Sequence, residues 1–330
     1  MDQPTPDHPS CKFCGSTELL KSSGDSVYYG IAYSVFYCPH CAIGMTWPQP
    51  DVATLERFYA PGEYRAEEGK RFIAPVEWLF ELHKKLQFTR LSGGLSAGNM
   101  LDIGCGSGYT ASLFARNGWS VTGVEFSEET AGHARDTYGI PVVTSVSQLQ
   151  GMYDLILVNH VLEHYYDPAR LLQECSRLLT PTGRLVVAVP NFSSFQSRIG
   201  QKNWFHRDLP IHLFHFAEDG LAGLLVRSGY TIIGRSHADW AQNFYGWLQT
   251  LLNCANLQYN SLYDFLRMRN KGGDGMSTSV FFSLLLSVLA VPASLFGMVV
   301  ERVFRTGGVI CFTAVRNQAS LSQEDIYRAE

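Results

Sequence analysis

Four of the eight cysteines form two Cys-x-x-Cys pairs, Cys11 with Cys14 and Cys38 with Cys41. Two such pairs around a short, β-prone segment are typical of a structural zinc site, because four thiolates complete a tetrahedral shell and leave no open position for catalysis. So few cysteines in a chain of this length do not make a disulfide scaffold, and we expect a reducing compartment. The pattern predicts a zinc ribbon over residues 11–50 that binds structural Zn²⁺.

A second group of residues has the pattern of a nucleoside site. The run 101–108 (LDIGCGSG) is typical of a strand, a glycine turn and a helix, and glycine is needed where the backbone approaches a ligand closely. Asp102 stands just before the glycines. Glu125 ends the next expected strand, where a carboxylate can accept both ribose hydroxyls. An NAD enzyme is the main alternative, but its GxGxxG spacing would place the third glycine one residue later.

Alternating strands and helices must position these residues. Uninterrupted apolar strands separated by helices indicate a parallel sheet that is covered on both faces, so we predict an α/β, doubly wound fold. Helices are expected to begin near residues 109, 128 and 168, with another over 217–227. The expected strands are 100–103, 121–124, 142–143, 153–158, 184–189, 231–233 and 308–315.

Residues 98–236 resemble the class I S-adenosylmethionine-dependent methyltransferases. The resemblance is carried by LDIGCGSG, the acid that ends the second strand, YDLILVNHVLEH and LLTPTGRLVVAVPN. It implies a Rossmann-like, seven-stranded sheet and S-adenosylmethionine as the cofactor. The sulfonium methyl is already activated, so the protein supplies in-line placement and removal of the acceptor's proton.

The resemblance also implies roles for individual residues. Asp102 would hold the cofactor amine and Glu125 the ribose hydroxyls. Many relatives have an aspartate after the third strand for the adenine amino group. The aligned place here reads Thr-Ser-Val, which leaves Ser145 as the expected partner. The other implied contacts are Gly104, Cys105 and Gly106 at the turn, Phe126 against the adenine, and Asn159 and His160 beside the methionine.

Candidate bases lie after the fourth and fifth expected strands, where histidines gather; histidine titrates near neutral pH. Residues 203–216 resemble a segment of methyltransferases from glycan and cell-surface gene clusters, roughly Asp-x-Pro-x-His-Leu-x-His-Phe-Ser. On this resemblance His212 or His215 is the expected base or acceptor contact, with Asp208 as a helper and His160 as a further catalytic candidate. The alternative is a packed aromatic loop with satisfied histidines.

His160, Glu163 and His164 would share one face if their stretch is helical. The arrangement is related to a divalent-ion site of quinone-biosynthesis O-methyltransferases, which have carboxylates where His160 and Glu163 stand. Packing at the start of a helix is the interpretation we prefer.

The ribbon and the resemblance together imply a small-molecule acceptor: a sugar, a glycan or a lipid-linked glycan intermediate, methylated on oxygen or alternatively on carbon. A quinone or natural-product methyltransferase, a ribosomal RNA methyltransferase and a non-catalytic, cofactor-binding partner subunit remain alternatives. The net charge of −4 argues against nucleic acid as a partner, and so do Lys12 and Lys21 as the only lysines or arginines of residues 11–47.

Residues 276–300 contain no charged side chain and are long enough to cross ~30 Å of hydrocarbon. They lie between two expected neighbouring strands of one sheet, so both ends must be on the same side. A single crossing is therefore excluded unless residues 240–266, which are less apolar, also cross. We expect an in-plane or hairpin element that contacts one leaflet, at the cytoplasmic face of the membrane. A helical cap buried on the domain or in a homodimer is the alternative. The flanking basic residues are Arg267, Arg269, Lys271, Arg302 and Arg305.

The overall composition fits several domains. Of the 330 residues 46% are hydrophobic, enough for a core, while 17% are charged against a usual ~25%, which indicates apolar surface. The polar N-terminus has no features of a signal peptide, so we expect a cytoplasmic protein. The predicted parts are a disordered tail (1–10), the zinc ribbon (11–50), a helical linker or lid with Tyr59 and Tyr64 (51–97), the methyltransferase core (98–236), a hydrophobic helical insertion (237–306), and the last strand and tail (307–330).

Overall fold

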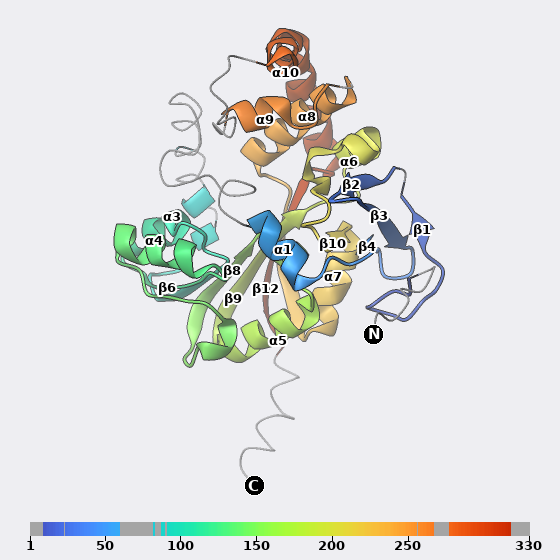
Figure 1. Ribbon diagram of the computed structural model, residues 1–330. Helices are drawn as coiled ribbons and strands as arrows, with labels where there is room; N and C mark the ends of the chain where they lie inside the picture. The colour runs from blue at the N-terminus through green and yellow to red at the C-terminus, as the bar shows by residue number, and fades with distance from the viewer. Residues whose placement is uncertain are drawn as a thin grey trace. The chain divides into compact units, whose positions relative to one another are not determined.

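The chain folds into two compact units in the computed structural model (Figure 1). Residues 190–220, which the sequence groups with the core, belong to the same unit as the cysteine pairs. The structure describes residues 9–22, 24–59, 82, 87–89, 91–255, 257–266 and 277–317. Unit 1 contains Met1–Glu81, Pro190–Gly220 and His237–Ile310, and unit 2 contains Leu82–Val189, Leu221–Ser236 and Cys311–Glu330.

Unit 2 is built around a seven-stranded sheet with the order β11-β12-β9-β8-β5-β6-β7. Strands β5 to β8 run parallel, β9 is parallel to β8, and β11 is antiparallel to β12. The strands are β5 (Asn99–Ile103), β6 (Ser120–Val124), β7 (Val142–Val143), β8 (Tyr153–Asn159), β9 (Leu179–Pro190), β11 (Tyr230–Ser236) and β12 (Val309–Arg316). The predicted doubly wound α/β class and its seven strands are confirmed.

Hydrophobic burial explains the order of this sheet. The central strand β8 carries Leu155, Ile156, Leu157 and Val158 in succession, and all four side chains are buried. Such a run can be satisfied only where helices cover both faces of the sheet. The antiparallel pairing of β11 with β12 brings both ends of the intervening insertion back to one sheet, as expected.

The helices of unit 2 begin where local chemistry favours a start. The Ser127 side chain caps α4 by accepting a hydrogen bond from the Thr130 amide. The Asp167 side chain caps α5 by accepting a hydrogen bond from the Arg170 amide, and Pro168 occupies the first helical position. The helical elements are α3 (Tyr109–Arg116), α4 (Glu128–Tyr138), α5 (Pro168–Leu178), α7 (Glu218–Arg227), and the 3-10 turns η1 (Val146–Gln148) and η2 (Leu162–His164).

Unit 1 contains a second, antiparallel sheet that carries the cysteine pairs. Its path is β1-β3-β4-β10, with β2 paired to β3, so a strand from residues 214–216 extends the predicted ribbon. The strands are β1 (Leu20–Lys21), β2 (Ser26–Tyr28), β3 (Ile31–Cys38), β4 (Ile43–Trp47) and β10 (Phe214–Phe216). Helix α1 (Val52–Tyr59) follows β4 in the chain.

The remaining elements of unit 1 are helical. Within the segment expected to form an in-plane or hairpin element, residues 278–304 form one unbroken helix, α10, so a hairpin there is excluded. Tyr64, Arg267, Arg269, Lys271 and most of the predicted linker helix lie outside the described residues. The helices are α6 (Phe195–Gly200), α8 (Trp240–Cys254), α9 (Ser261–Leu266) and α10 (Thr278–Phe304), with 3-10 turns η3 (Gln201–Asn203) and η4 (Phe205–Arg207).

Candidate active site

The turn between β5 and α3 needs glycine for two different reasons. Gly104 has φ +70°, and a Cβ there would lie 2.3 Å from a methyl carbon of Val161. Gly106 has φ +56°, but no atom of the described part of the chain lies within 4 Å of the position its Cβ would take. The amides of Gly104 and Cys105 donate to the Val124 carbonyl at 2.8 and 3.0 Å. The turn is therefore fixed at Gly104 and open at Gly106.

Glu125 is buried and ties this turn to the end of β6. Its Oε2 accepts a hydrogen bond from the Gly106 amide at 3.1 Å, and its Oε1 accepts from the Ser127 amide at 3.0 Å. Asp102, near the end of β5, is buried as well. Two carboxylates thus lie in the strands that flank the glycine turn, and one of them orders it directly.

The end of β8 holds buried polar atoms that no described residue pairs. Asn159 Oδ1 and His160 Nε2 have no hydrogen-bond partner among the residues that the structure describes. His160 has φ +56°, uncommon for a residue with a side chain, while its amide donates to the Ala188 carbonyl at 2.8 Å. Unpaired buried polar groups and a strained backbone both lower the stability of the folded state. In proteins they are found most often at ligand-binding sites.

Two further sequence candidates flank the turn. Phe126 follows Glu125 directly, and its side chain is 73% exposed. The Ser145 hydroxyl caps η1 by accepting from the Ser147 amide, within a reciprocal capping box with Gln148. Their expected contacts with an adenine stay predictions.

The stretch after β8 is not a continuous helix. His160 precedes η2 in a left-handed conformation, so the common helical face with Glu163 and His164 does not form. His160 Nδ1 nevertheless lies 3.5 Å from Glu163 Oε1, and Glu163 is buried. This contact is consistent with the packing role preferred from the sequence.

The two histidines expected to act on an acceptor lie in unit 1 and differ in their surroundings. His212 Nδ1 faces the His206 carbonyl at 3.0 Å and must donate to it, so Nε2 carries the lone pair of the neutral ring. This Nε2 lies 3.9 Å from Asp208 Oδ2. His212 and Asp208 therefore have the arrangement of a base with a carboxylate that stabilises its protonated form.

His215 is buried in the antiparallel sheet of unit 1. It lies in β10 opposite Gly44, and its Nε2 is 3.0 Å from Thr46 Oγ1. The Thr46 hydroxyl donates its proton to the His212 carbonyl, so it must accept from His215 Nε2–H. Burial, with the charges of His212 and Arg207, lowers the pKa of His215 well below its usual value. The neutral His212 ring has an Nε2 lone pair that can accept a proton, whereas His215 uses Nε2–H to bond Thr46; the role of either histidine as the base stays a prediction.

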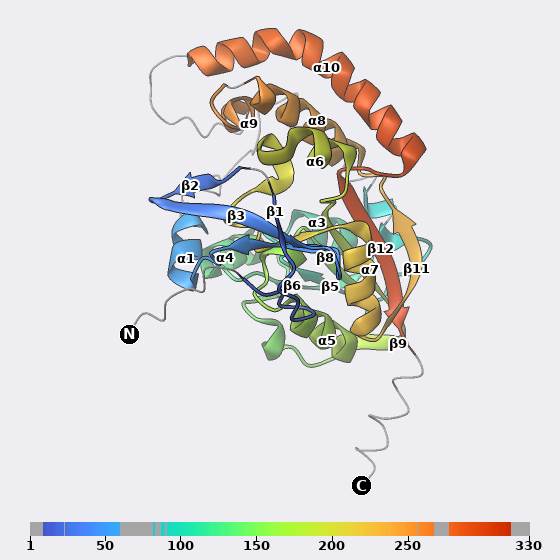
Figure 2. The same ribbon diagram turned by 90° about the vertical axis from the view of Figure 1, so that its right-hand side faces the viewer.

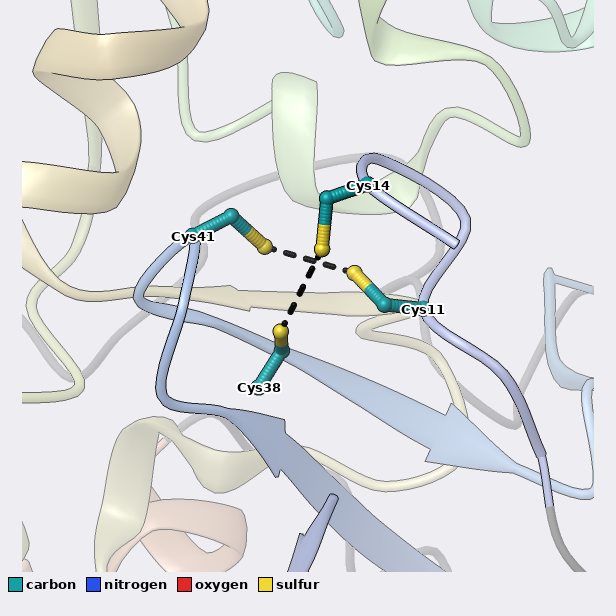
Figure 3. A group of neighbouring side chains, drawn as sticks. All are labelled: Cys11, Cys14, Cys38 and Cys41. Atoms are coloured by element: carbon teal, nitrogen blue, oxygen red, sulfur yellow. Dashed lines mark hydrogen bonds between the residues drawn. The ribbon is translucent and has the colours of Figure 1, made fainter. Parts of the chain in front are cut away.

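The four cysteines of unit 1 converge, as Figure 3 shows, with Cys11 facing Cys41 and Cys14 facing Cys38. The sulfur distances are 3.3 Å between Cys11 and Cys41 and 3.6 Å between Cys14 and Cys38, and all four sulfurs lie within 4.8 Å of one another. Zn–S bonds of about 2.3 Å in a tetrahedron place sulfurs about 3.8 Å apart. The residues fit a closed Zn²⁺ site.

Comparison with known proteins bears on unit 2. Residues 77–234 match a family model described as "Methyltransferase domain". The glycine turn and the strands β5 to β9 described above lie within these matched residues.

Relatives of the methyltransferase domain include a probable S-adenosylmethionine-dependent methyltransferase of Mycobacterium tuberculosis, 31% identical over 173 residues, or 49% of this chain and 60% of the relative. A ubiquinone biosynthesis O-methyltransferase of Aeromonas salmonicida is 34% identical over 113 residues, 31% of this chain and 48% of the relative. The crystal structure of an S-adenosylmethionine-dependent methyltransferase from Mesorhizobium loti aligns with a TM-score of 0.44 at 15% identity, covering 71% of this chain and 98% of that one. This chain therefore spans about 60% of the Mycobacterium tuberculosis relative.

S-adenosylmethionine suits the residues that the methyltransferase domain brings together. A methionyl ammonium has three donors, and Asn159 Oδ1 and His160 Nε2 are buried atoms that can accept from it. The space over Gly106 admits a ligand against the backbone. The sequence did not identify Thr46, which orders the two histidines, because no local signal pairs residues 43–45 with 214–216.

Proposed function

We propose that the protein transfers a methyl group from S-adenosylmethionine to an oxygen of a sugar, a glycan or a lipid-linked glycan intermediate. A carbon atom of the same acceptor is the alternative position. The observation that carries the proposal is the cradle at the carboxyl ends of β5, β6 and β8. It combines an open glycine turn, a buried carboxylate and unpaired buried acceptors.

Each polar side chain of this cradle has a role in binding the cofactor. Glu125 would accept hydrogen bonds from the ribose hydroxyls while it keeps the Gly106 amide in place. Asn159 and His160 would accept from the ammonium and so fix the methionine arm. The bound cofactor supplies a methyl group on a sulfonium, already activated toward a nucleophile, so the residues around it need only bind and orient it.

The acceptor's proton requires a base, and we assign this role to His212. The acceptor oxygen would take the methyl group, and the electron pair of the carbon–sulfur bond would stay on the sulfur of the released product. The hydroxyl proton passes to His212 Nε2, and Asp208 stabilises the resulting imidazolium. The dyad would then release this proton to solvent, so that His212 is neutral again for the next acceptor.

The sugar or glycan acceptor is supported by the resemblance of residues 203–216 to enzymes of glycan gene clusters. A quinone-like aromatic acceptor is the second candidate, because the domain is similar to the ubiquinone biosynthesis O-methyltransferase of Aeromonas salmonicida. A panel of sugar nucleotides, lipid-linked sugars and catechols, assayed with methyl-labelled cofactor, separates the two. Label in a catechol only would replace the sugar proposal.

Cofactor binding is tested by calorimetric titration with S-adenosylhomocysteine. Glu125→Gln keeps one oxygen acceptor but loses the other and the charge, so we expect its affinity to fall at least tenfold. Glu129→Gln is the matched control, because Glu129 is an exposed carboxylate of α4. If Glu125→Gln binds S-adenosylhomocysteine as tightly as Glu129→Gln does, Glu125 does not contact the nucleoside.

The assignment of the base is tested with His212→Gln. We expect methyl transfer to fall by at least a hundredfold, within the range of a general base, with unchanged affinity for S-adenosylhomocysteine. A wild-type protein that binds the nucleoside but methylates no acceptor of the panel would favour the non-catalytic partner subunit.

A further inference from the structure

Helix α10 has two faces of opposite character. Figure 2 shows it as one long helix beside α8 and α9, which belong to the same unit. Its inward face is lined by small or polar residues, which allow the helices to approach closely. A Cβ on Gly297 would lie 2.7 Å from the Trp247 ring, and the hydroxyls of Ser261 and Ser283 are 2.9 Å apart. The buried residues of α10 are Val280, Ser283, Ala290, Ser294, Gly297 and Glu301.

The outward face is apolar along its whole length. Leu289 is 74% exposed, and Val288 and Phe296 are each 70% exposed. At 27 residues the helix is about 40 Å long, and contiguous exposed apolar surfaces of this extent mark a binding surface. The exposed large apolar residues of α10 are Phe281, Phe282, Leu284, Leu285, Val288, Leu289, Leu295, Phe296, Val299, Val303 and Phe304.

The inward contacts decide how this helix can meet a bilayer. A helix that crosses the hydrocarbon is surrounded by lipid, or by other membrane segments, for about 20 residues. Here the buried positions recur from Val280 to Glu301, so one side is committed to α8 and α9 and, at Glu301, to Gln196 of α6. α8 also buries polar side chains, among them Gln249 and Asn253. Only an orientation with the helix axis in the membrane plane exposes the apolar face to lipid and leaves these contacts intact.

The composition of the outward face distinguishes lipid from a protein partner. The energetic centres of protein interfaces are enriched in Trp, Tyr and Arg and poor in Leu and Val, whereas the exposed face of α10 has no Trp or Tyr and is built mainly from Leu, Val and Phe. Charged residues appear only at the C-terminal end, where Arg302 and Arg305 are exposed. Guanidinium groups beside an apolar face fit the phosphate headgroups of an anionic leaflet.

We infer that α10 lies in the plane of an anionic membrane surface, with its Phe, Leu and Val face among the acyl chains and its C-terminal arginines at the headgroups. This attachment is independent of the proposed reaction. It places unit 1, with the His212 loop, at the membrane.

Flotation of the full chain with vesicles tests the inference. The triple variant Val288→Ser, Leu289→Ser, Phe296→Ser removes three of the four most exposed apolar side chains of α10. The control is Leu20→Ser, Val27→Ser, Val226→Ser, because these residues are 61%, 66% and 59% exposed but lie on other elements. We expect the wild type and the control to float with vesicles of phosphatidylcholine and phosphatidylglycerol, and the α10 variant at least tenfold less. Vesicles of phosphatidylcholine alone should bind less wild-type protein.

Several results would overturn the inference. Circular dichroism and thermal melting must first show that the α10 variant is folded. A folded wild type that does not float, or that forms a dimer dispersed by the α10 substitutions without binding vesicles, would show that a second copy covers this face. Flotation that is equal in wild type and α10 variant would place the lipid contact elsewhere.

The in-plane orientation has its own measurement. A fluorescent label is placed on Phe282→Cys, near one end of α10, or on Leu289→Cys, in its middle, in a Cys254→Ser background that removes an exposed thiol. Quenching by lipids brominated at known depths should place both labels at the same shallow level. A middle label much deeper than the end label would indicate a crossing helix and refute the orientation.

Discussion

Substituting Gly104 and Gly106 by alanine separates folding from cofactor binding. Both glycines have positive φ, so an alanine at either position is strained by about 1–2 kcal/mol. At Gly106 no atom of the described residues lies close enough to oppose the added methyl group. At Gly104 the methyl group would lie 2.3 Å from Val161 Cγ2, and relief of such overpacking adds about 1–3 kcal/mol.

The two variants should therefore fail in different ways. Gly106→Ala should lose about 1–2 kcal/mol of unfolding free energy but bind S-adenosylhomocysteine at least tenfold more weakly, because its methyl group occupies the space of the ligand. Gly104→Ala should lose about 2–5 kcal/mol. Adding Val161→Ala should recover the part that comes from the overlap, since that change removes both methyl carbons.

Thermal melting with and without the nucleoside, together with calorimetric titration, measures both quantities. A Gly106→Ala protein with native affinity would refute the placement of the ligand against this turn. Equal melting temperatures for the two alanine variants, with no effect of Val161→Ala on Gly104→Ala, would refute the steric argument.

Three further predictions concern unit 1. Thr46→Val leaves the His212 carbonyl and the His215 ring without the hydroxyl that pairs them, at a cost of about 1–3 kcal/mol each. We expect slower methyl transfer with unchanged nucleoside affinity, and recovery in Thr46→Ser; a fall in affinity instead would contradict the role of Thr46. Elemental analysis of purified Cys38→Ser should show the loss of zinc relative to wild type, and equal zinc content would exclude the four-cysteine site. Burial raises the pKa of Glu301 to about 7, although hydrogen bonds from Gln196 oppose the shift. The folded state therefore holds this proton more tightly than the unfolded state, so stability should fall by up to about 3 kcal/mol between pH 4.5 and pH 7. Glu301→Gln should flatten this pH dependence, and a wild type that is equally stable across the range would rule out the buried acid.

The sequence predicted the methyltransferase sheet well because its signals are local. A run such as Leu155 to Val158 can be buried only as a central strand, and Ser127 identifies the start of α4 by its own hydrogen bond. The turn glycines are recognisable for the same reason, since their φ angles exclude most side chains. The cysteine pairs likewise predicted their own convergence.

Long-range pairing explains what the sequence could not predict. β10 joins the ribbon through backbone hydrogen bonds to β4, which carry no residue signature, so residues 190–220 were grouped with the core. The buried state of His215 follows from that pairing and was equally hidden. The left-handed conformation of His160 is set by its surroundings rather than by its type, and this is why the helical face with Glu163 does not form.

The central claim is that the cradle formed by Gly106, Glu125, Asn159 and His160 binds the nucleoside of a methyl donor. Titration of the purified full chain with S-adenosylhomocysteine in a calorimeter tests it most directly. We predict saturable binding at one site per chain, weakened at least tenfold by Glu125→Gln and unchanged by Glu129→Gln. A folded wild-type protein that shows no binding of this nucleoside would contradict the account.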